Sequence, residues 1–115
     1  MTEAIPARVR FRDIKPYDAP ESLDELHGPA AGTVTLPLRV RWVPGSRAYD
    51  VGEIGGARVV YQAVLAEGTV EDQRRYLNRG RLIELWPDLH LDQRVVDLWE
   101  GRFPELRGRS WRTSR

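Results

Sequence analysis

Hydrophobic side chains recur at every second position in two segments of the N-terminal half. Residues 7–13 place apolar side chains on one face and arginines on the other, and residues 34–43 alternate in the same way from Val34 to Trp42. A period of two predicts β-strands with one solvated face. Pro37 cannot donate a ladder hydrogen bond, so the second strand is expected at a sheet edge or with a bulge. A turn at 44–46 should lead into a third strand at 47–51 and form a hairpin.

The pattern changes from residue 54 onward, where apolar positions recur every three or four residues. This period predicts helices near 54–67, 70–77, 80–86 and 93–103. Sequence signals for their ends are Gly68 as a C′ residue, Thr69 and Asp92 as N-caps, and Pro87 as a stop. Residues 78–80 are expected to interrupt the helical region. The segment between the first two strands is expected to be mostly loop, with a short helical turn around 21–26.

These elements predict a small α+β domain, with a short antiparallel sheet followed by three or four helices, one of which covers its apolar face. The domain should span residues 1–106 and be followed by a basic C-terminal tail at 107–115. The apolar phase of each segment predicts which large side chains form the core. They are Val40, Trp42, Tyr61, Leu65, Trp86, Trp99 and Phe103.

Composition narrows the class of protein. The chain has 115 residues, of which 41% are hydrophobic and 30% charged, which fits one domain with a modest core. Cysteine is absent, which excludes disulfides, thiolate nucleophiles and cysteine-based metal sites. No apolar run is long enough to span a bilayer, and the N-terminus lacks the apolar core of a signal peptide. These features predict a soluble, cytoplasmic protein.

Catalytic motifs are not evident. His27 and His90 each lack a second ligand at metal-binding spacing, and no serine lies in a nucleophile-elbow pattern. The glycine-rich run at 52–56 could hold an anion, but it lacks the lysine of a P-loop, so a connector is the favoured interpretation. We therefore assign no catalytic residue, metal or cofactor. An enzyme or enzyme subunit remains the third functional hypothesis.

Arginines supply two candidate nucleic-acid surfaces. The first is a sheet face formed by Arg8, Arg10, Arg12, Arg39 and Arg41, for which an ordinary solvated face is the alternative. The second is the tail with Arg107, Arg109, Arg112 and Arg115, where Trp111 could stack on a base or anchor in a partner, and a frayed terminus is the alternative. A small DNA- or RNA-binding regulator is accordingly the second functional hypothesis.

Aromatic residues and a family resemblance point instead to a protein partner. The chain has four tryptophans, more than the apolar pattern needs, which makes Trp86, Trp99 and Trp111 candidate interface anchors. The runs LPLRVRWVPGSRAYDV, VVYQAVLAEGTVEDQRRYLN and LIELWPDLHLDQRVVDLWEGRFPEL resemble a group of small actinobacterial proteins associated with operons for nucleotidyltransferase-type toxins. The resemblance covers about residues 20–106. It implies a non-enzymatic, antitoxin-like protein that binds and restrains a toxin-like partner encoded nearby, with homo-oligomers also compatible.

Overall fold

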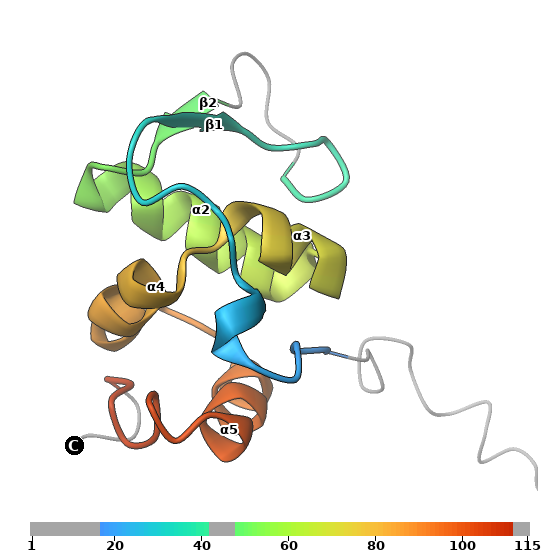
Figure 1. Ribbon diagram of the computed structural model, residues 1–115, viewed down its shortest axis with the longest axis vertical. Helices are drawn as coiled ribbons and strands as arrows, with labels where there is room; N and C mark the ends of the chain where they lie inside the picture. The colour runs from blue at the N-terminus through green and yellow to red at the C-terminus, as the bar shows by residue number, and fades with distance from the viewer. Residues whose placement is uncertain (1–16, 42–47, 112–115) are drawn as a thin grey trace, which may run out of the picture.

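The computed structural model describes residues 17–41 and 48–111, which form an α+β arrangement (Figure 1). The predicted strand at 7–13 and the turn at 44–46 lie outside the described residues. Two short 3-10 helices occupy Leu23–Glu25 and Trp86–Asp88. The remaining elements of the described part are β1 (Thr33–Thr35), β2 (Ala48–Asp50), α2 (Ile54–Glu67), α3 (Val70–Tyr76), α4 (Arg79–Leu85) and α5 (Gln93–Arg102).

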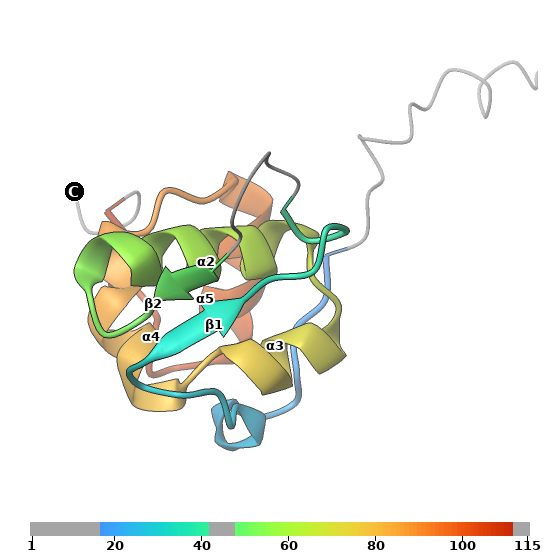
Figure 2. The same ribbon diagram turned by 90° about the horizontal axis from the view of Figure 1, so that it is seen from above.

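Helix α2 lies between the sheet and the C-terminal helices. In Figure 1 the two strands lie on one side of α2, while α4 and α5 lie on the other. In Figure 2, seen from above, the strands lie over α2, and β2 is in contact with α2, so this helix covers one face of the sheet. The expectation that a helix covers the sheet is therefore confirmed. Among the described residues, no helix combines the length and the apolar character that a membrane crossing requires.

The sheet consists of β1 and β2, paired antiparallel with Thr33 opposite Asp50 and Thr35 opposite Ala48. The predicted long strand at 34–43 is wrong, because β1 ends at Thr35 and a turn follows. The carbonyl of Pro37 accepts hydrogen bonds from the backbone N–H groups of residues 40 and 41, at 3.0 and 3.2 Å. This turn leaves Leu38 50% exposed, although the alternation placed it on the buried face.

Helices α2, α3 and α5 begin at the predicted residues and α4 begins one residue earlier than predicted, and side chains cap the starts of α3, α4 and α5. Thr69 Oγ1 accepts from the backbone N–H of Asp72, whose carboxylate accepts in return from the backbone N–H of Thr69, a reciprocal capping box. Asp92 caps α5 as expected, and Asn78, predicted only as part of an interruption, caps α4. Gly68 ends α2 as its C-cap in an extended conformation with φ −86°, and the space allows only glycine because a Cβ there would lie 2.8 Å from the Val64 carbonyl oxygen.

Six of the seven side chains predicted for the core lie in the described residues, and all six are buried. Trp86 and Trp99 are fully buried with ring centroids 6.4 Å apart, and Phe103 packs 5.2 Å from the Trp99 ring. Val40, Tyr61 and Leu65 are also buried, whereas Trp42 lies outside the described residues. Ile54, the first residue of the predicted helix at 54–67, is 57% exposed, because the first turn of α2 extends beyond the sheet.

Candidate partner-binding groove

Helix α2 carries almost no charge on the side facing away from the core. Its buried positions include Ala57, Val60 and Val64, which lie on one face at 100° per residue. The opposite face presents Gly55, Val59, Gln62 and Ala66, all of them uncharged and none fully buried. A helix on the surface of a domain normally presents charged residues there. The outer face of α2 thus carries no charge at these four positions, three of which are half-buried.

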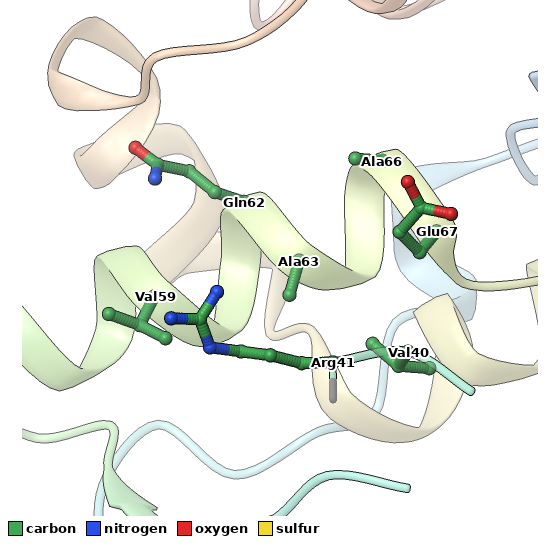
Figure 3. A pocket seen from close by; sticks show the side chains of 7 residues that line it. All are labelled: Val40, Arg41, Val59, Gln62, Ala63, Ala66 and Glu67. Atoms are coloured by element: carbon green, nitrogen blue, oxygen red, sulfur yellow. The ribbon is translucent and has the colours of Figure 1, made fainter. Parts of the chain in front are cut away.

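A cavity of about 420 Å³ lies between this face and the turn that follows β1. We call it the α2 groove, and Figure 3 shows the side chains around it. Its floor is made of small and branched apolar side chains, and its rim carries a guanidinium, an amide and a carboxylate. The lining residues are Val40, Arg41, Val59, Gln62, Ala63, Ala66 and Glu67.

The rim side chains are held by hydrogen bonds from other elements. Arg41 Nε donates to the Tyr49 hydroxyl at 3.1 Å, which ties the turn to β2. Gln62 Oε1 accepts from the backbone N–H of His90 at 2.8 Å, which ties α2 to the segment before α5. The walls of the groove therefore belong to the folded domain.

The groove is lined by apolar, amide and charged side chains. Its lining residues include one guanidinium and one carboxylate but no histidine, serine or cysteine. Within the described residues, no cluster of three or more metal-ligating side chains is found. An apolar floor with a few polar groups at the rim is the usual composition of a surface that binds a protein segment.

Two of the candidate anchors, Trp86 and Trp99, are both 0% exposed. Trp86 Nε1 donates to a Glu100 carboxylate oxygen at 2.8 Å. A partner cannot reach either ring in this fold, so neither can anchor an interface. Sequence periodicity correctly predicted that both rings are buried. The number of tryptophans in the chain wrongly indicated that they are interface anchors.

Trp111, the third candidate, is half-buried, and its ring centroid lies 5.3 Å from that of His90. The segment before it is folded against α5 through Glu100, whose carboxylate accepts from the backbone N–H groups of Gly108 and Ser110 at 3.2 and 3.0 Å. Gly108 and Ser110, which lie in the predicted basic C-terminal tail, are thus bonded to α5. No sequence pattern indicates these bonds, because a single glutamate on a helix does not reveal its partners.

The predicted arginine face is not assembled in the described residues. Arg8, Arg10 and Arg12 lie outside them. Arg39 and Arg41 follow β1 in the turn region and do not belong to a strand.

Arg39 forms a bidentate pair with Asp72, at 2.5 and 2.7 Å. Hydrogen bonding to this guanidinium lowers the pKa of Asp72 to about 2. A guanidinium already paired in this way is less available to a phosphate.

Other arginines bind backbone carbonyls of their own chain. Arg81 donates to the carbonyl oxygen of Val51 at 3.2 Å, and Arg102 donates to that of Ala19 at 2.7 Å. Arg107 reaches the carbonyl oxygen of Glu100 at 3.3 Å. The planar guanidinium with its several donors suits this task, so much of the arginine content has an internal role. Of the other tail candidates, Arg109 is exposed, and Arg112 and Arg115 lie outside the described residues.

The glycine-rich run at 52–56 connects β2 to α2. Asp50 Oδ1 accepts from the backbone N–H of Gly52 at 2.8 Å, and a Cβ on Gly56 would lie 2.2 Å from the Asp50 carbonyl oxygen. Close packing therefore explains Gly56. A carboxylate at this position also opposes the binding of an anion, so the geometry favours the connector.

No family model, no curated protein and no solved structure matches this chain.

Proposed function

We propose that this chain is a non-enzymatic binding protein that docks a partner protein in the α2 groove. The observation that carries the proposal is the uncharged outer face of α2 together with the 420 Å³ cavity above it. Specific protein interfaces combine apolar and polar groups, and the groove is lined by four apolar and three polar side chains.

The family resemblance implies an antitoxin-like role, and this role specifies the class of protein to which the partner belongs. In this hypothesis the partner is a toxin-like protein encoded by a neighbouring gene, and binding masks its active cleft. The interface should bury on the order of 800 Å² on each side, as specific complexes do. The exposed Leu38 follows β1 within the turn that forms one wall of the groove and would extend the apolar contact.

Co-expression with the neighbouring gene tests the proposal. We expect the two proteins to co-purify, and growth inhibition by the partner to be relieved by this chain. Ala66→Arg should weaken the complex about ten-fold or more, because it places a charged side chain on the groove floor. Ala30→Arg is the matched control, since Ala30 is exposed and is not a lining residue of the groove.

Three results would count against the proposal. Failure to co-purify, together with unchanged growth, would remove the antitoxin role and favour the nucleic-acid hypothesis. Equal loss of affinity in the two variants would show that added positive charge, and not the groove, controls binding. An unaffected Ala66→Arg complex would place the interface elsewhere.

A further inference from the structure

The two outer edges of the sheet differ in what lies against them. The edge of β2 is closed by the start of α2, because the Asp50 carbonyl accepts from the backbone N–H of Glu53 at 3.2 Å and Gly56 packs against the same carbonyl. The other edge belongs to β1, whose Thr33 and Thr35 are both exposed. Within the described residues, the edge of β1 is therefore the place where a further strand can pair.

The backbone of β1 turns four polar groups toward this edge. Val51 donates its backbone N–H to the Gly32 carbonyl at 2.8 Å, which fixes a hydrogen-bonded pair next to the strand. Bonded and non-bonded pairs alternate along an antiparallel ladder, so Val34 bonds to β2, while Thr33 and Thr35 point their N–H and C=O groups away from it. Proteins often block such an edge with a charge, a proline or a bulge, and the Thr-Val-Thr sequence of β1 has none of these. The ligand that pairs with these groups is an extended backbone.

Helix α3 lies alongside the segment that contains β1. The residues before the strand are held at the end of α3, where the Gly28 N–H donates to the Leu77 carbonyl at 2.7 Å. The residues after the strand are held at the start of α3 by the Arg39–Asp72 pair. Hydrogen bonding to Asp72 raises the pKa of Arg39, and Tyr76 adds a smaller electrostatic effect, which places this ring near Arg39. The side of α3 that bears Asp72 and Tyr76 therefore lies next to the β1 segment.

Two guanidinium groups make this surface positive. Arg75 is exposed and lies about 60° around the α3 axis from Asp72, since helical residues advance by about 100° each. Glu71 in the preceding turn is bonded to Arg74 at 3.1 Å, and none of the described carboxylates pairs with Arg75. The Arg39 side chain keeps 59% of its surface exposed beside Asp72. The surface next to the edge therefore attracts carboxylates.

We propose that the edge of β1 binds an extended, acidic segment of a partner protein. The segment adds to the sheet as a third strand, exchanges hydrogen bonds with Thr33 and Thr35, and presents carboxylates to Arg39 and Arg75. A second copy of the chain is a poorer occupant, because a two-fold pair would bring the arginines of both copies together. None of these residues lines the α2 groove, so this site is separate from that of the proposed function.

Peptide binding to the full chain, followed by fluorescence anisotropy, tests the proposal. The probe is a labelled peptide of alternating valine and glutamate, and its matched control has lysine in place of glutamate. We expect the glutamate peptide to bind at least about ten-fold more tightly. The same peptide with N-methyl groups on its central backbone nitrogens keeps its side chains but loses the donors. It should bind about ten-fold more weakly or not at all.

Substitutions in the chain locate the binding site. Thr35→Pro removes one N–H that faces the edge and keeps the bonds to β2, so it should weaken binding about ten-fold. Thr35→Ala keeps this N–H and should change the affinity less than about two-fold. Arg75→Glu should abolish the preference for glutamate over lysine. Arg109→Glu is its control, since Arg109 is exposed in the C-terminal segment, at the other end of the domain from β1 (Figure 1). Thermal unfolding of each variant checks that the fold is retained.

Hydrogen exchange of the full chain tests the edge without any substitution. The N–H groups of Thr33 and Thr35 should exchange quickly in the free chain and slow at least about ten-fold with the glutamate peptide. The N–H of Val34 should be protected in both states, because it bonds to β2. Slow exchange of the two threonines in the free chain at every concentration would show that a segment of the same chain covers the edge. Slowing only as the protein concentration rises would show a second copy.

Either of these exchange results would overturn the proposal. Equal affinity for the glutamate and lysine peptides, or for the N-methylated peptide, would also overturn it. The outcome is independent of the proposed function, because the Ala66→Arg test concerns the α2 groove alone. A chain that binds the glutamate peptide but does not co-purify with the neighbouring protein would refute only the antitoxin role.

Discussion

Asp72→Asn should destabilise the fold at neutral pH by about 1 to 2 kcal/mol. The Asp72 residue is 3% exposed, and its carboxylate accepts bonds from Arg39 Nη1 and Nη2, from the Thr69 backbone N–H at 2.8 Å and from the Thr69 hydroxyl at 3.1 Å. An asparagine of similar volume keeps the packing. It removes the charge and turns one acceptor into a donor that faces the guanidinium.

The magnitude follows from the pKa of this group. A pKa lowered from 3.8 to about 2 corresponds to roughly 2.4 kcal/mol of stability, at about 1.36 kcal/mol per unit. The side chain of Arg39 is 59% exposed, so solvent screens part of its interaction with Asp72. The expected destabilisation is therefore about 1 to 2 kcal/mol, below the full value. Because the folded-state pKa is lowered, the contribution is present above about pH 4 and is lost as the pH falls toward 2.

Urea unfolding at pH 7, 5, 4 and 3 measures the effect. The difference between wild type and Asp72→Asn should be largest at pH 7 and fall to about half by pH 3. Glu71→Gln is the matched control, because that side chain lies in the same helical turn but is 80% exposed, and it should change the free energy by less than about 0.5 kcal/mol. A cost for Asp72→Asn that is equally small, or that does not depend on pH, would refute the reasoning.

Three further predictions concern the core, a tight packing position and the C-terminal arginines. Trp99→Ala should cost about 3 to 5 kcal/mol in the free energy of unfolding, and a loss below about 1 kcal/mol would show that the ring is not in the core. Gly28→Ala should lower the melting temperature, because the new Cβ would lie 2.4 Å from the Tyr76 carbonyl carbon, and an unchanged value would contradict this contact. If the tail contacts phosphates, changing Arg109, Arg112 and Arg115 to Gln should lower the salt slope of duplex DNA binding by up to about three, since each contact contributes about 0.9. These substitutions leave in place the backbone groups that bind Glu100, whereas deletion of 107–115 would remove them and should also destabilise the fold.

The sequence by itself determined the helices and much of the core. Helical periodicity and capping residues are local signals, since a cap and the N–H group it binds lie two or three residues apart. This is why α2 was predicted at its observed bounds and why Thr69 and Asp92 were recognised as caps. Burial of Trp86 and Trp99 followed from the same periodicity.

The tertiary structure decided the end of β1, the role of the arginines and the place of the groove. The alternation through Leu38 predicted a longer strand, but a turn at Pro37 ended it, and the choice between strand and turn depends on what packs against the segment. Arg39 meets Asp72 across 33 residues of sequence, and Glu100 binds the segment at 108–110 through bonds that no local pattern encodes. The α2 groove also depends on such long-range contacts, because its walls come from segments about 20 residues apart and become neighbours only when the chain folds.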